Sequence, residues 1–285
     1  MTAPVIDAHH HLWDPAEADY PWMTEALALI VRRFGAEDLA PLLPNAGVNG
    51  TIVVQARHDL AESRALLATA AVTPFIVGVV GWVDLTSDDV AATIAALRAG
   101  PGGDRLVGIR HQVHDEPDAG WLQRRDVRRG LEAVEAMGLA YDLLIRPREF
   151  PAALAVVEDL PNLRFVVDHL AKPPLRGGAR EPWAAGLRTF GALPNVWCKL
   201  SGLVTEADWA SWTIGDLAPF VDVGLEAFGP DRLLFGSDWP VCLLAASYQE
   251  VIGSARELTA GLGPSERTAI FGGTARSVYR LPDPA

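Results

Sequence analysis

Short apolar segments alternate with longer amphipathic ones along most of the chain. Eight of the short segments are rich in branched and aromatic residues and end at polar or glycine positions, which is typical of buried strands. The first predicted strand starts at about Val5, and the others cover 50–55, 75–83, 106–111, 140–145, 163–169, 196–200 and 233–238.

Helical patterns follow the strands, with polar residues such as Asp59 before them and glycines such as Gly47 and Gly138 after them. The predicted helices cover 37–46, about 59–71, 87–98, 126–137, 151–159, 183–192, 214–228, 248–262 and 265–279. The segment 15–33 is a long loop with aromatic residues, and it is interpreted either as a lid over a site or as a strut on the surface.

This regular order predicts parallel βα units joined by right-handed crossovers. We predict an α/β fold, a TIM-type (β/α)8 barrel formed as a single domain over residues 1–285. An open doubly wound sheet is the main alternative. No G-x-G-x-x-G follows the first strand, which argues against a dinucleotide-binding sheet.

Composition narrows the class of partner. Of 285 residues, 49% are hydrophobic, enough for a large core, and the formal charge of -12 opposes binding to nucleic acid. No apolar run reaches the roughly 20 residues of a membrane helix, and no signal peptide is evident. Cys198 and Cys242 form no C-x-x-C motif. These features predict a cytoplasmic protein without membrane or nucleic-acid partners.

The most informative stretch is Asp7-Ala8-His9-His10-His11 at the end of the first strand. Strict alternation places Asp7, His9 and His11 on one face, with Ala8 and His10 on the other. Two imidazoles that lie two residues apart on a strand could bind a divalent ion or a polarised oxygen. The alternative is a polar edge strand with a chance run of histidines.

Polar residues also end most of the other strands. Since reactive groups of βα barrels gather where strands run into the following loops, these positions are candidates for a site. They are His9, His11, Gln55, Trp82, Asp84, Arg110, His111, Arg146, His169, Lys199 and Asp238.

Specific catalytic or metal-binding roles can be proposed for Asp238 and His169. Asp238 could be a metal ligand or a general base, although an aspartate before Trp-Pro also suits a turn. His169 could supply a third nitrogen, or it could be a core histidine bonded to Asp168. Lys199 could contact substrate or form a Schiff base, and it could equally be an ion-pair partner.

Other candidates are suited to holding a substrate. Arg110 and His111 could hold substrate oxygens, or pack against loops. Trp13, Trp22, Trp82 and Trp239 fall near strand ends or in the long loop, and their faces would suit a sugar-like ligand.

Taken in order, five motifs resemble the amidohydrolase superfamily. They are Ile6-Asp7-Ala8-His9-His10-His11-Leu12-Trp13, Tyr20-Pro21-Trp22-Met23, Val167-Asp168-His169-Leu170-Ala171-Lys172-Pro173, Lys199-Leu200-Ser201-Gly202 and Phe235-Gly236-Ser237-Asp238-Trp239-Pro240. The likeness spans essentially the whole chain. It is greatest for the branch that contains lactonases acting on L-fuconolactone, L-rhamnonolactone and 2-pyrone-4,6-dicarboxylate.

The chain departs from the fuller superfamily pattern. It lacks the fourth-strand lysine that would become a carbamylated bridging ligand, and its fifth strand has no histidine. The resemblance therefore implies one divalent metal, zinc by preference, on His9, His11, His169 and Asp238. It also allows a metal-independent site in which the three histidines polarise the carbonyl by hydrogen bonds.

The resemblance implies hydrolysis of a small-molecule lactone by a carboxylic ester hydrolase that belongs to carbohydrate metabolism, with a homo-oligomer possible. Asp238 would activate water, and His9, His11 and His169 would polarise the carbonyl. The expected substrate-binding residues are Trp22, Gln55, Trp82, Arg110, His111, Lys199 and Trp239.

A neutral aldonolactone such as L-fuconolactone is preferred as substrate. A dicarboxylate calls for several convergent arginines, and the candidates Arg57, Arg110 and Arg146 are few. The alternatives are a lactonase acting on 2-pyrone-4,6-dicarboxylate, a metal-dependent decarboxylase or hydratase of the superfamily, and a non-catalytic binding protein on a barrel scaffold.

Overall fold

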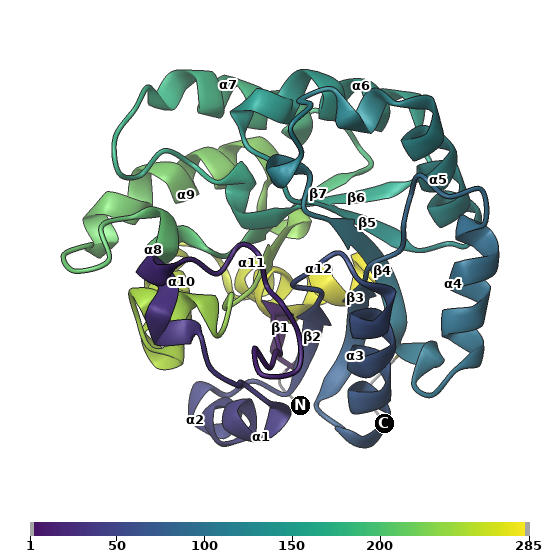
Figure 1. Cartoon of the computed structure of the whole chain (residues 1–285). Coiled ribbons are helices and arrows are strands. Elements are labelled where there is room, and N and C mark those ends of the chain that lie inside the picture. The colour runs from purple at the N-terminus through teal and green to yellow at the C-terminus, as the bar shows by residue number, and fades with distance from the viewer. Residues whose placement is uncertain (1–2, 283–285) are drawn as a thin grey trace.

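Eight parallel strands stand side by side in chain order in the computed structural model, which describes residues 3–282. Helices surround them (Figure 1), so the predicted barrel is confirmed. The strands are β1 (Ile6–His10), β2 (Gly50–Val54), β3 (Ile76–Gly81), β4 (Leu106–His111), β5 (Ala140–Leu143), β6 (Arg164–Val167), β7 (Val196–Leu200) and β8 (Leu233–Phe235).

The barrel closes between β1 and the residues just after β8. The backbone N–H of Asp238 donates to the carbonyl of His9 at 2.8 Å, and that of His11 donates to the carbonyl of Trp239 at 2.7 Å. Two segments far apart in the sequence are therefore held in register where the predicted site residues lie.

Apolar side chains fill both sides of the strands. One group lines the barrel interior from positions such as Ala8, Val54 and Val166, and the C-terminal residues Val278 and Tyr279 pack against it. A larger group lies between the strands and the outer helices. Both faces of each strand are buried, which explains the nearly continuous apolar runs in the sequence.

The outer helices follow the prediction closely, with shifts at their ends. The longer ones are α3 (Leu60–Val72), α4 (Val90–Ala99), α5 (Arg125–Ala136), α6 (Phe150–Asp159), α7 (Arg180–Gly191), α9 (Ile214–Phe228) and α10 (Tyr248–Leu258). Shorter ones are α1 (Ala36–Leu39), α2 (Leu43–Ala46), α8 (Leu203–Glu206), α11 (Pro264–Thr268) and α12 (Thr274–Val278). In the described range 3–282, no helix is both long and apolar enough to cross a membrane.

Two local predictions are wrong. The single helix over 265–279 is interrupted between α11 and α12, because Gly272 is not helical and passes close to the carbonyl of Pro4. The long loop contains a 3-10 helix, η1 (Glu25–Ile30).

The alternation predicted for the first strand is confirmed for His9 and His11, which face Asp238 together, and is wrong for Asp7. The register of β1 against β2 shifts between Asp7 and His10, so strict alternation is lost there. Asp7 accepts a hydrogen bond from Tyr248 of α10, and His10 contacts Thr51, whereas His9 and His11 face Asp238. Asp7 therefore supports the outer layer and does not share a face with the two histidines.

Candidate active site

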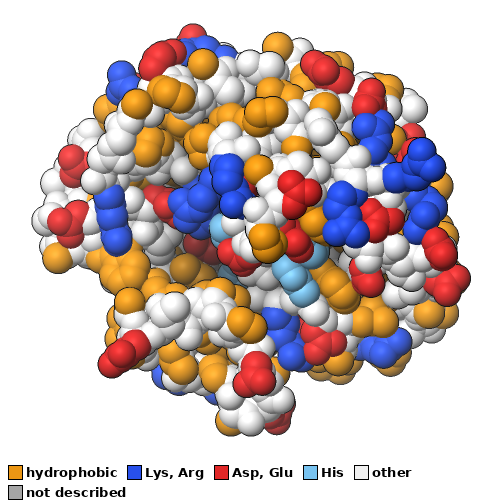
Figure 2. Space-filling model, turned by 45° about the horizontal axis from the view of Figure 1, so that its top comes forward, with side chains coloured by type: hydrophobic (Ala, Val, Ile, Leu, Met, Phe, Trp, Pro, Cys, Tyr) orange, Lys and Arg blue, Asp and Glu red, His pale blue; other side chains and the backbone are white. Residues whose placement is uncertain are grey.

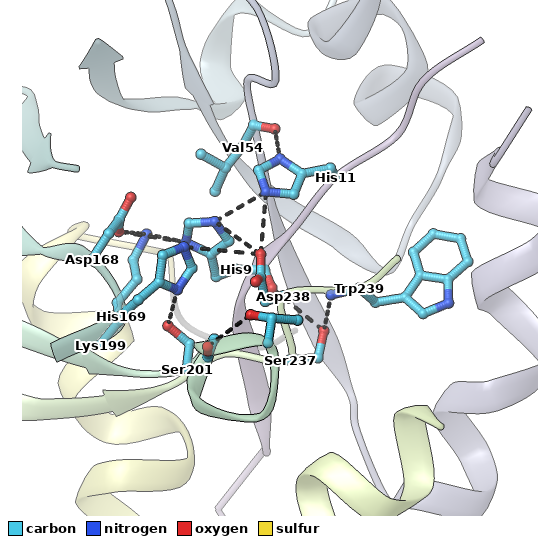
Figure 3. A network of polar contacts seen from close by, with 12 residues as sticks. His9, His11, Val54, Asp168, His169, Lys199, Ser201, Ser237, Asp238 and Trp239 are labelled. Carbon is cyan, nitrogen blue, oxygen red and sulfur yellow. Dashed lines mark hydrogen bonds and ion pairs between the residues drawn. The ribbon is translucent and has the colours of Figure 1, made fainter. Parts of the chain in front are cut away.

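Three histidines and one aspartate converge at the carboxyl ends of the strands. His9 and His11 come from β1, His169 follows β6 and Asp238 follows β8. Their Nε2 atoms lie 3.8, 3.5 and 3.9 Å from Oδ1 of Asp238, and the Nε2 atoms of His9 and His11 are 3.2 Å apart. The four side chains point toward one another (Figure 3), as the strand-end positions predicted.

The backbone adopts an unusual conformation at both late positions. His169 has φ 54°, and the three residues after it are also left-handed, while Asp238 has φ 58°. Each such non-glycine residue costs about 1–2 kcal/mol. Strain of this kind is found where side chains must be aimed at a functional site.

Second partners orient the imidazoles. Nδ1–H of His11 donates to the carbonyl of Val54 at 2.8 Å, and Nδ1 of His169 is 2.8 Å from Oγ of Ser201. A carbonyl oxygen only accepts, so the proton of His11 resides on Nδ1 and the lone pair of its Nε2 faces Asp238.

A buried ionic network supports the site from below. Lys199 Nζ lies 2.5 Å from Asp142, 2.9 Å from Asp168 and 3.0 Å from Nδ1 of His9. Arg110 donates to Asp168 at 3.0 Å and lies 3.2 Å from Nε2 of His9. Lys199, Asp142 and Asp168 are fully buried. Each cation therefore faces a carboxylate, as buried charges require.

Burial sets the protonation of the centre. It lowers the pKa of His169 to about 4, and it lowers the pKa of His9 well below the usual value, with a further contribution from Lys199. For Asp238, burial alone would raise the pKa, but the facing His169 and His11 lower it overall. At neutral pH the site therefore presents neutral imidazoles and an ionised carboxylate.

This donor set fits a divalent ion. Ligand atoms of His9, His11 and Asp238 all lie within 4.8 Å of one another, and imidazole nitrogens with a carboxylate oxygen are typical zinc ligands. The outward bond from Nδ1 of His11 to a backbone carbonyl is the support that metal-binding histidines generally have.

A cavity of about 490 Å³ opens above these residues. His11, Arg110, His169 and Asp238 lie in its lining. On this face of the molecule, charged and histidine side chains gather around a hollow (Figure 2). The volume is sufficient for a small-molecule substrate.

Some of the predicted substrate-binding residues line the cavity, some are buried beneath it, and some lie outside it. Trp22 and Arg110 line the cavity. Gln55 and Lys199 are fully buried beside Arg110 and His9, where they orient other groups. Trp239 does not line the cavity; its ring packs edge-on against Phe34, with ring centroids 5.4 Å apart.

Trp82 and His111 belong to a separate stack beside the cavity. Nε1–H of Trp82 donates to Nδ1 of His111 at 3.1 Å, so the proton of this neutral ring lies on Nε2, 2.8 Å from Glu116. His58 stacks on His111 with centroids 3.9 Å apart. His58, His111 and Glu116 are close enough to suggest a second metal site. However, the lone pair on Nδ1 of His111 already accepts a hydrogen bond from Trp82 and is not free for a metal. We therefore interpret the cluster as structural.

Several residues of the cavity lining were missed in the strand-end list. Lys172, Glu206 and Trp209 contribute to it, as do His114 and Asp115. Lys172 stands in a recognised motif, three residues after His169, which could have drawn attention to it. Glu206 ends the short helix α8, and no local pattern indicates that it turns back toward the barrel mouth.

Gly202 gives a direct test of how closely His169 is held. A Cβ atom at Gly202 would lie 2.6 Å from Nδ1 of His169. We expect Gly202→Ala to displace the ring and to lower kcat/KM by at least about tenfold, since small misplacements near the chemistry are costly.

The control is Gly47→Ala, in the same left-handed region (φ 64°, ψ 29°, against φ 64°, ψ 8° for Gly202), where an added Cβ atom would meet only Arg256 at an ordinary contact distance of 3.7 Å. Both variants should lose about 1 kcal/mol of unfolding free energy from strain. Steady-state kinetics and urea unfolding separate the two effects. Equal activity losses in the two variants would show that His169 does not require this close packing.

Comparison with known proteins agrees with this geometry. The amidohydrolase family model matches residues 6–281, so the chain belongs to the amidohydrolase family. The L-fucono-1,5-lactonase of Burkholderia ambifaria is 40% identical, covering 98% of this chain and 97% of that protein. The L-fucono-1,5-lactonase of Burkholderia multivorans is also 40% identical, covering 100% and 99%.

A solved structure shows the same architecture. An amidohydrolase from Burkholderia multivorans with bound zinc superposes with a TM-score of 0.94 at 40% identity, covering 98% of this chain and 100% of that one. The bound zinc in this relative is consistent with the donor set found here.

Proposed function

We propose that this protein hydrolyses a neutral sugar lactone, an aldonolactone such as L-fucono-1,5-lactone, to the corresponding acid. The observation that carries the proposal is the convergence of His11, His169 and an ionised Asp238 in the lining of one cavity, with the buried His9 against them. Two lactonases at 40% identity over nearly the whole chain support the substrate class.

The roles follow from position and protonation. Asp238 takes a proton from the attacking water and returns it to the ring oxygen that leaves as an alcohol. Arg110 lies beside His9 and would stabilise the negative charge that develops on the carbonyl oxygen. The lone pair at Nε2 of His11 would act on that oxygen through a bound ion, with His9 and His169 beside it. Lys199 and Gln55 hold His9 and Arg110 and do not contact substrate.

A divalent ion, zinc by preference, would be held by His9, His11 and Asp238, with His169 beside them. When bound, such an ion would polarise the lactone carbonyl as a Lewis acid. Metal analysis of the purified protein, followed by assay after chelation, tests this part of the proposal. Full activity in metal-free protein would show that hydrogen-bonding groups alone polarise the lactone carbonyl.

Charge balance in the cavity favours a neutral substrate. Glu206 accepts from Lys172 at 2.9 Å and lies 3.4 Å from Arg146, while Arg110 is paired with Asp168. Asp115 lines the same wall and interacts electrostatically with Lys172 and Arg146, so these two cations face two carboxylates. A dicarboxylate would need the cations free to form bidentate pairs.

A lactone panel tests the proposal. Aldonolactones and 2-pyrone-4,6-dicarboxylate are incubated separately with the protein, and acid release is followed with a pH indicator. We expect hydrolysis of neutral aldonolactones. Activity on the dicarboxylate alone would contradict the sugar substrate, and carbon dioxide release from aromatic acids would favour a decarboxylase.

Replacing Glu206 tests the charge balance. Glu206→Gln leaves Lys172 and Arg146 without their carboxylate, so we expect the inhibition constant of 2-pyrone-4,6-dicarboxylate to fall by about tenfold. The control is Glu226→Gln, which removes an exposed carboxylate paired with Arg188 away from the cavity. Unchanged inhibition in Glu206→Gln would show that these cations do not face the substrate.

A further inference from the structure

The two sides of the cavity have opposite chemical character. The connections after β4, β5, β6 and β7 contribute the charged residues of the lining, Asp115, Arg146, Lys172 and Glu206, and this polar wall also includes Leu144 and Trp209. The connections after β1 and β8 contribute Trp22, Leu27, Val241 and Leu244, which form an apolar wall. Because β1 and β8 are neighbours in the closed barrel, the apolar residues lie together on one side of the mouth.

The residues of the apolar wall are held in place by packing and by a hydrogen bond. Leu27 lies in η1 and Val241 and Leu244 form the ends of η9 (Val241–Leu244), and these two 3-10 helices pack against each other. Trp22 is fixed by a hydrogen bond from its Nε1 to the carbonyl of Ala56 at 2.8 Å. Leu27, Val241 and Leu244 are partly buried against the main core.

A sugar lactone placed over Asp238 must therefore present different chemistry to the two walls. Hydroxyl groups find partners on the polar wall, where charged groups can donate and accept. A hydroxyl turned toward Leu27, Val241 and Leu244 would lose its bonds to water and find no side-chain partner among them. A methyl group at that position would bury apolar area instead.

Resting on the proposed lactone hydrolysis, we propose that Leu27, Val241 and Leu244 form a specificity site that selects 6-deoxy aldonolactones over their 6-hydroxy counterparts. The methyl carbon of the 6-deoxy substrate packs on the apolar wall while the ring hydroxyls face Glu206 and Lys172. The selection acts through binding of one end of the substrate and leaves the reacting groups unchanged.

A matched substrate pair measures the effect. L-fucono-1,5-lactone and L-galactono-1,5-lactone differ only by the hydroxyl on C6, and each can be generated in situ from its parent sugar. For the wild-type protein we expect kcat/KM to favour the 6-deoxy lactone by about tenfold to a hundredfold, the range for an unpartnered hydroxyl in an apolar pocket.

Two variants should narrow that preference by about tenfold, because each adds a hydrogen-bonding group to the wall. They are Leu27→Asn and the nearly isosteric Val241→Thr, which guards against a folding defect. The control is Leu29→Asn, in the same 3-10 helix but 63% exposed and outside the cavity lining. This control should leave the ratio of the two kcat/KM values unchanged.

The outcomes separate the two proposals. Hydrolysis of both lactones with similar kcat/KM, or an equal change of the ratio in all three variants, would overturn the specificity site while the proposed hydrolysis stands. Hydrolysis of neither lactone would overturn the proposed function itself. A wild-type preference that falls in Leu27→Asn and Val241→Thr but not in Leu29→Asn supports the inference.

Discussion

Replacing Asp238 by asparagine is expected to lower kcat for lactone hydrolysis by at least about a hundredfold, because the amide does not accept a proton from water. The substitution conserves shape, and Asp238 is 4% exposed among the three imidazoles, so solvent does not readily replace the missing base. Initial rates at saturating lactone measure the effect.

A second strand-end aspartate provides the control. Asp84 follows β3 but is exposed, and its carboxylate accepts from Thr86. Asp84→Asn should keep nearly full activity. A loss of less than tenfold in Asp238→Asn would remove Asp238 from the role of base. Tight lactone binding without turnover in both the wild type and Asp238→Asn would indicate a binding protein.

Replacing Lys199 by methionine is expected to destabilise the protein by about 3–5 kcal/mol, the usual effect of removing one partner from a buried ionic network. Asp142 and Asp168 would each lose a contact with Lys199, and both are fully buried. Burial already raises the pKa of Asp142 to about 6 even though Lys199 lowers it, which shows how strongly this carboxylate depends on the cation. Urea unfolding measures the change.

Two further variants control this prediction. Arg128→Met breaks the surface pair with Asp159 and should cost less than about 1 kcal/mol. Lys199→Met combined with Asp142→Asn should recover part of the loss, because one unpaired charge is removed. A loss similar to that of Arg128→Met would show that the buried network contributes little to stability.

The sequence alone predicts the barrel because its evidence is repeated along the chain. Each apolar strand and its helix carry the same signal, so errors of a few residues at the ends, as at β8 or α10, do not change the fold. The convergence of His9, His11, His169 and Asp238 follows from the same rule, since all four lie at carboxyl ends of strands.

The parts that could not be predicted depend on contacts distant in sequence. A register shift in β1 turns Asp7 away from His9, and no residue type in that stretch indicates it. Trp82 and His111 occupy strand ends but bond to each other beside the cavity. Glu206 reaches the cavity from a helix, because Lys172 and Arg146 surround it there.

The fate of the water oxygen distinguishes attack at the lactone carbonyl from attack at C5. When L-fucono-1,5-lactone is hydrolysed by the protein in water enriched with oxygen-18, attack on the carbonyl places the label in the new carboxylate. We expect label there and none in the hydroxyl on C5, at a rate well above the spontaneous reaction. Label in that hydroxyl, or no release of acid above the spontaneous rate, would contradict this expectation.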